Sequence, residues 1–129
     1  RLYDLGMKPD WWKLEPNDSM AAWANIERTI ARNDPRCRGV VLLGLSAPEH
    51  ELIASFDAAA SSPMVKGFAV GRTIFADAAE KWLAGRIDDE SAITDLSRRF
   101  GVLVDAWRAA KARATGVLEA GVLDAGGSA

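Results

Sequence analysis

The 129-residue chain is 49% hydrophobic and 26% charged, the composition of a folded domain, which excludes collagen-like and low-complexity structures. Its 16 lysines and arginines are balanced by 18 acids, which argues against a nucleic-acid-binding surface. The single cysteine excludes an internal disulfide, and the Cys and His residues lack the spacing of a metal site. We therefore expect a cytoplasmic protein with no membrane segment, no metal and no cofactor.

Three short apolar segments predict β-strands. The first is the aromatic segment 11–15, and the second is the uninterrupted apolar run 38–44. The third covers residues 65–71. Because the second run shows no polar alternation, it is typical of a strand buried on both faces of a parallel sheet.

Helical spacing of apolar residues follows each predicted strand. Capping side chains predict that the first helix starts after Ser19 and the second after Ser46, and a third helix follows at Thr73. The most regular helix opens at Asp88 or Asp89. Its predicted apolar stripe is Ala92, Ile93, Leu96, Phe100, Leu103, Val104 and Trp107, and the helical tryptophans expected in the core are Trp23, Trp82 and Trp107.

Alternating strands and helices predict an α/β fold with a parallel sheet, either an open doubly wound sheet or part of a (β/α)8 barrel. Residues 1–113 are predicted to form the domain, and residues 114–129 a poorly ordered C-terminal tail. In both folds the chemistry gathers at the carboxyl ends of the strands. Candidate site residues are therefore sought where each predicted strand ends.

A lysine inside the first predicted strand is the most informative candidate. Strand alternation puts Lys13 and Glu15 on one face, and we expect that face either to be covered by helices or to point into a barrel. Burial favours the neutral amine, which can attack a carbonyl to form a Schiff base, and Glu15 could pair with the lysine or shuttle protons. The alternative is a buried Lys–Glu ion pair without chemistry.

Two glycine-bearing turns follow the second and third predicted strands. The first contains Gly44, Leu45 and Ser46, and the second contains Gly71 and Arg72. Glycine permits close approach of a ligand, the N-terminus of a helix favours an anion, and arginine can bind phosphate through two hydrogen bonds. The pair of turns predicts a phosphate site, whereas the alternative is a pair of ordinary turns with a surface arginine.

Three motifs carry a resemblance to a known family: PDWWKLEP at residues 9–16, DPRCRGVVLLGL at 34–45 and VKGFAVGRTIF at 65–75. Over residues 1–113 the chain resembles the C-terminal domain of bacterial bifunctional 5-dehydro-2-deoxygluconokinase/5-dehydro-2-deoxyphosphogluconate aldolases of inositol catabolism. That domain is similar in turn to the class I tagatose-1,6-bisphosphate aldolases. The resemblance implies the C-terminal part of a TIM barrel, about strands six to eight with their helices.

The resemblance also implies a reaction. Lys13 matches the Schiff-base lysine, and the turns 44–46 and 71–72 match the phosphate-binding strand ends. The implied reaction is cleavage of 2-deoxy-5-keto-gluconate 6-phosphate to dihydroxyacetone phosphate and malonate semialdehyde without a metal. Glu15 would handle protons, and the missing barrel strands, the kinase domain or a second copy would be the partner.

Other functions stay open from the sequence. The chain could be a non-catalytic domain that binds a sugar phosphate or supports assembly of an attached kinase. A doubly wound nucleotide-binding module is disfavoured, because neither a G-x-G-x-x-G motif nor a P-loop follows a predicted strand.

Overall fold

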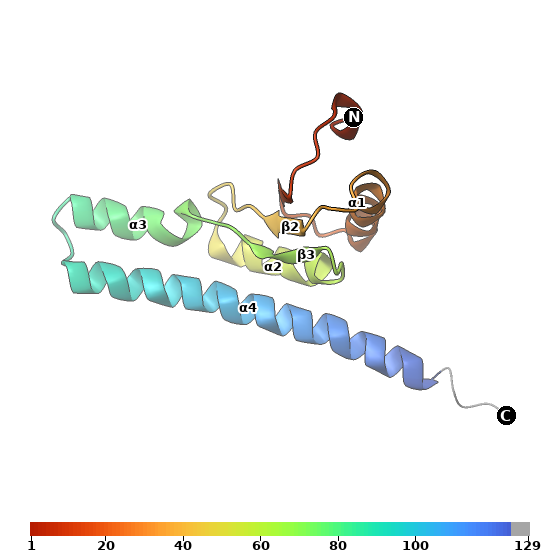
Figure 1. Cartoon of the computed structure of the whole chain (residues 1–129). Coiled ribbons are helices and arrows are strands. Elements are labelled where there is room, and N and C mark those ends of the chain that lie inside the picture. Colours follow the sequence, from red (N-terminus) through yellow and green to blue (C-terminus); the bar gives the residue numbers. More distant parts are fainter. Residues whose placement is uncertain (125–129) are drawn as a thin grey trace.

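The fold is given by a computed structural model that describes residues 1–124, with side chains described through residue 116. A small parallel sheet carries helices along one side, and a long C-terminal helix runs beneath them (Figure 1). The elements are η1 (Tyr3–Leu5), β1 (Trp11–Leu14), α1 (Met20–Asn33), β2 (Gly39–Leu42), α2 (Glu49–Ala60), β3 (Val65–Phe68), α3 (Arg72–Leu83) and α4 (Asp89–Asp124).

The sheet has the order β1-β2-β3, and both pairs of neighbouring strands are parallel. Lys13 lies opposite Val41 in the register of β1 and β2. Each pair of strands is joined through a helix, as parallel neighbours require. The predicted α/β class with a parallel sheet is confirmed, and its extension to a barrel stays a prediction.

One face of the sheet forms the core. Val40 and Leu42 are fully buried there, and they belong to a cluster with Trp23 of α1 and Leu52 of α2. Fully burying such a side chain contributes about 1.5–3 kcal/mol, so this layer of helix on sheet holds the fold together. On the opposite face of β1, Trp11 and Lys13 are exposed.

The strands stop earlier than the sequence predicts. The last bonds of the two ladders are donated by Leu43 N–H to Leu14 O and by Ala69 N–H to Leu42 O. Pro16 follows two residues after Leu14, the last residue of β1, and it has no N–H to donate to the ladder. Glu15 therefore lies beyond the ladder, and the alternation that paired it with Lys13 does not extend to it.

The predicted helix starts are partly right. Ser19 caps α1, because its Oγ accepts the Ala22 N–H at 3.2 Å. Ser46 is not the cap of α2, which begins at Glu49 after Pro48. Ser46 lies instead in a tight turn with a φ of 65°, a backbone conformation that does not lead into a helix.

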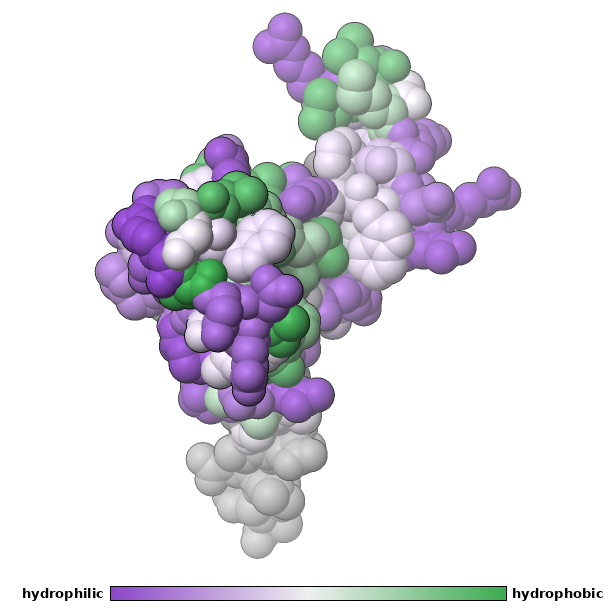
Figure 2. Space-filling view, turned by 90° about the vertical axis from the view of Figure 1, so that its left-hand side faces the viewer, coloured by the Kyte–Doolittle hydropathy of each residue, from purple (hydrophilic) through white to green (hydrophobic). Residues whose placement is uncertain are grey.

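The apolar stripe of α4 is only half buried. Leu103 is fully buried, whereas Ile93 is 63% exposed and Phe100 is also exposed. Trp82 of α3, predicted in the core, is 47% exposed, and its indole N–H donates to Asp89. Ile93 and Trp82 lie on the part of the α3–α4 hairpin that extends past the sheet, where no layer covers them, whereas the Phe100 ring contacts Phe68 of β3 edge to face. At the hairpin end, hydrophobic areas alternate with hydrophilic ones (Figure 2).

The long helix α4 crosses the predicted domain boundary at residue 113 without a break and continues to Asp124. Residues 114–124 thus extend a helix, where the sequence predicts a tail, and residues 125–129 lie outside the described residues. No helix in residues 1–124 combines the length and apolar character needed to cross a membrane.

Candidate functional site

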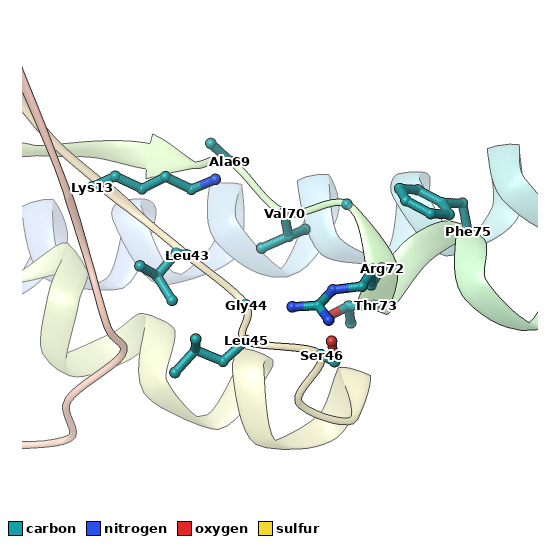
Figure 3. Close-up of a pocket in the computed structure, with 11 residues that line it drawn as sticks. Lys13, Leu43, Gly44, Leu45, Ser46, Ala69, Val70, Arg72, Thr73 and Phe75 are labelled. Carbon is teal, nitrogen blue, oxygen red and sulfur yellow. The ribbon is translucent and has the colours of Figure 1, made fainter.

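A pocket of about 350 Å³ lies at the carboxyl ends of the strands, where parallel α/β sheets bind ligands. Its walls come from β1 and from the segments that follow β2 and β3 (Figure 3). The lining residues are Lys13, Leu43, Gly44, Leu45, Ser46, Ala69, Val70, Gly71, Arg72, Thr73 and Phe75.

Almost every residue predicted from the sequence meets in this pocket. Lys13 reaches it from β1, the turn 44–46 forms one wall, and the turn of Gly71 and Arg72 forms another. Glu15 is absent from the lining because β1 ends before it. The structure therefore brings together a lysine amine and two turns, without the predicted carboxylate.

The first turn is strained. Gly44 O accepts the Ala47 N–H at 2.7 Å, and the two residues between them have positive φ, 46° at Leu45 and 65° at Ser46. Turns of this kind favour glycine or asparagine, and a left-handed conformation costs other residues about 1–2 kcal/mol each. Strain of this kind gathers at functional sites, so the turn supports a role for Leu45 and Ser46 in binding.

The second turn opens α3. Gly71 O accepts the N–H groups of Ile74 and Phe75, which leaves the N–H groups of Arg72 and Thr73 without a helical acceptor. These groups and the helix dipole favour an anion, and the Arg72 guanidinium extends over the space between the two turns, facing Ser46 (Figure 3). The α3 start is thus the more suitable anion site, because the first turn of α2 carries Glu49 and Glu51.

The two turns touch. The Thr73 hydroxyl donates to Ala47 O at 3.1 Å across 26 positions of sequence. A Cβ at Gly44 would lie 2.9 Å from Thr73 Oγ1 and from Val70 Cγ1, so only glycine fits there without movement. Sequence reasoning missed Thr73 as a site residue and used it only as a helix start; a hydroxyl next to the Gly-Arg turn was the available signal.

The charges in the pocket are positive. Lys13 and Arg72 line it, and none of the lining residues is an acid or a histidine. The Lys13 amine points along the sheet toward the side where Arg72 lies (Figure 3). Among the described residues, no group of three His, Cys, Asp or Glu side chains could hold a metal ion. The arrangement suits a small molecule with an anionic group.

The setting of Lys13 differs from the prediction. Its side chain lies on the sheet face without helices and is exposed, so the helix-covered alternative is wrong, and the barrel alternative stays a prediction. No salt bridge joins it to an acid in the described part of the chain. The predicted Lys13–Glu15 ion pair is therefore not formed, and the amine is open to a ligand in the pocket.

A comparison with models of known protein families gives a match. A family model described as an uncharacterised protein conserved in bacteria, DUF2090, matches residues 1–111. No curated protein and no solved structure matches the chain. The matched residues include both turns, Lys13 and most of the described part of α4. The chain belongs to the DUF2090 family.

Proposed function

We propose that the protein is a class I aldolase-type lyase acting on a phosphorylated keto sugar, with Lys13 as the Schiff-base residue. One observation carries the proposal: an accessible lysine amine and the start of α3, with Arg72, share one pocket at the carboxyl ends of three parallel strands. A keto-sugar phosphate has the two groups that such a pocket recognises, a carbonyl for the amine and a phosphate for Arg72.

The chemistry follows from these groups. The Lys13 amine adds to the ketone, and loss of water gives a protonated imine. When the neighbouring carbon–carbon bond breaks, its electron pair moves into the imine to form an enamine, and the other fragment leaves as an aldehyde after its hydroxyl loses a proton. Protonation of the enamine and hydrolysis of the imine release the ketone product and the free amine.

Phosphate binding falls to the start of α3, and proton transfer falls to groups outside the pocket lining. Arg72 and the free N–H groups at the α3 start hold the phosphate, which fixes the distance from the carbonyl to Lys13. Because no acid or histidine lines the pocket, the hydroxyl proton passes to water or to a group outside the lining residues. With 2-deoxy-5-keto-gluconate 6-phosphate as substrate, the products would be dihydroxyacetone phosphate and malonate semialdehyde.

A second function is favoured by a specific observation. Lys13 is exposed and Glu15 lies outside the pocket, so the residues that line the pocket supply neither a desolvated amine nor a carboxylate or histidine base. A non-catalytic domain that binds a sugar phosphate through Arg72, attached to a kinase, would need neither. The two proposals differ in one respect, since only the lyase forms a covalent bond to Lys13.

Borohydride trapping separates the two functions. Incubating the intact protein with dihydroxyacetone phosphate and borohydride should attach the reduced ketose phosphate to the peptide containing Lys13. Lys13→Met should remove the adduct. Lys66→Met is the matched control, because Lys66 is another exposed strand lysine, but its amine donates to Pro63 O and it lies outside the pocket. Phosphate binding without an adduct would support the binding domain and reject the lyase.

A further inference from the structure

One hydrogen bond holds the two turns of the pocket together. The sheet ladder between β2 and β3 ends where Ala69 N–H donates to Leu42 O at 2.7 Å. Beyond the ladder, the two segments that line the pocket are residues 43–48 and 69–75. In the described part of the chain, the bond from Thr73 Oγ1 to Ala47 O is the only hydrogen bond between them. The spacing of the two turns therefore depends on a side chain.

The turn that Thr73 holds is the strained one. Leu45 and Ser46 have positive φ, and Ala47 closes the turn through its N–H to Gly44 O. A conformation that costs free energy persists only where surrounding contacts fix it. Thr73 donates its hydrogen bond to the carbonyl oxygen of this same residue, Ala47, and so holds the end of the turn in place.

Packing reinforces the bond. The Thr73 side chain is partly buried, and the Gly44 backbone lies so close that a Cβ there would be 2.9 Å from Thr73 Oγ1. Threonine is branched at Cβ, which restricts its χ1 rotamers and keeps the hydroxyl aimed in one direction. Because the hydroxyl proton is committed to Ala47 O, Thr73 is poorly placed to donate it to a ligand as well.

We infer that Thr73 is a positioning residue, which sets the separation of Ser46 and Arg72 and thereby the affinity of the pocket for a phosphate group. The inference rests on the phosphate-binding part of the proposed function. Ser46 and Arg72 face each other across the space between the turns (Figure 3). Without the Thr73 bond, the strained turn relaxes and Ser46 moves relative to the guanidinium.

The test compares two variants of Thr73 in the intact protein. Thr73→Val keeps the branched shape and removes the hydroxyl, whereas Thr73→Ser keeps the hydroxyl. Affinity for inorganic phosphate and for glycerol 3-phosphate is measured by titration calorimetry. Thr73→Val should weaken both affinities roughly three- to tenfold, as loss of one hydrogen bond implies, and Thr73→Ser should keep them within about twofold.

Thr29→Val is the matched control, because the Thr29 hydroxyl also donates to a backbone carbonyl, that of Asn25 at 2.7 Å, away from this pocket. It should leave phosphate affinity unchanged. Hydrogen exchange at the Ala47 amide should be faster in Thr73→Val and normal in Thr73→Ser, a change that a general loss of stability would not confine to this turn. If Thr73→Val does not fold, Thr73→Cys, with its weaker donor, should bind phosphate with intermediate affinity.

The outcomes distinguish the inference about Thr73 from the proposed function. If the wild-type protein binds phosphate and Thr73→Val binds it equally well, the inference about Thr73 fails and the proposed function stands. An equal loss of affinity in Thr73→Ser and Thr73→Val would also reject the inference, since the hydroxyl would not be the cause. If the wild-type protein binds no phosphate, both the proposed function and the inference are rejected.

Discussion

Replacing Gly44 by alanine places one methyl group between the two turns of the pocket. Its position would be 2.9 Å from both Thr73 Oγ1 and Val70 Cγ1, and 3.2 Å from Val70 Cβ. Neither neighbour is the free end of a flexible side chain, because Val70 is branched at Cβ and Thr73 is hydrogen bonded to Ala47. Overpacking of this kind costs about 1–3 kcal/mol, so we expect Gly44→Ala to lower the free energy of unfolding by that amount.

Urea unfolding followed by circular dichroism measures this loss, and Gly101→Ala is the matched control. A Cβ at Gly101 in α4 meets nothing within 4 Å, so the same substitution there should raise the free energy of unfolding by up to about 1 kcal/mol. Gly44→Ala should also weaken phosphate binding, because the turns are forced apart. Equal or greater stability of Gly44→Ala would refute the reasoning that the turns are in contact.

Two other substitutions test separate parts of the account. Leu45→Asn should raise the free energy of unfolding by up to about 1 kcal/mol in the same urea assay. Asparagine tolerates the positive φ at this position, and little packing is lost because Leu45 is 61% exposed. A lower free energy of unfolding would contradict the strain argument. Hydrogen bonds from Arg98 and Arg99 hold the pKa of Asp95 below its ordinary value in the folded protein. The charged carboxylate therefore stabilises the fold at pH values above its unfolded pKa, and this stabilisation is lost as the pH falls through its folded pKa. Asp95→Asn should therefore lower the free energy of unfolding at pH 7 by about 0.5–1 kcal/mol, and this deficit should disappear as the pH falls through the folded pKa of Asp95. Asp105→Asn is the control and should have little effect, because Asp105 is exposed and its nearest Arg108 nitrogen is 4.0 Å away. A deficit of Asp95→Asn that does not shrink as the pH falls would reject this role.

The sequence predicts the order of elements well, because local signals determine it. The apolar run of β2 and the Ser19 cap of α1 both depend on neighbouring residues, and both lie where expected. The clustering of Lys13 with both turns was also predictable, since parallel strands bring their carboxyl ends to one edge. These predictions need no knowledge of how distant side chains pack.

The errors concern ends of elements and burial, which depend on distant partners. Glu15 was expected beside Lys13, but strand alternation holds only while a neighbouring strand supplies ladder bonds, and β1 loses them after Leu14. Trp82 fits a helical stripe, yet the hairpin that carries it extends beyond the sheet. The bond from Thr73 to Ala47 joins residues far apart in sequence, so no local pattern could reveal it.

The central claim is that the Lys13 amine and the anion site at Arg72 form one pocket, and competition during borohydride trapping tests it most directly. Trapping of dihydroxyacetone phosphate on Lys13 is followed by peptide mass spectrometry while inorganic phosphate is added, in the wild type and in Arg72→Met. The account predicts that phosphate suppresses the wild-type adduct in a saturable way, and that Arg72→Met gives a weaker adduct that phosphate no longer suppresses. An adduct on Lys13 that is insensitive to both phosphate and Arg72→Met, or no adduct on Lys13 at all, would contradict it.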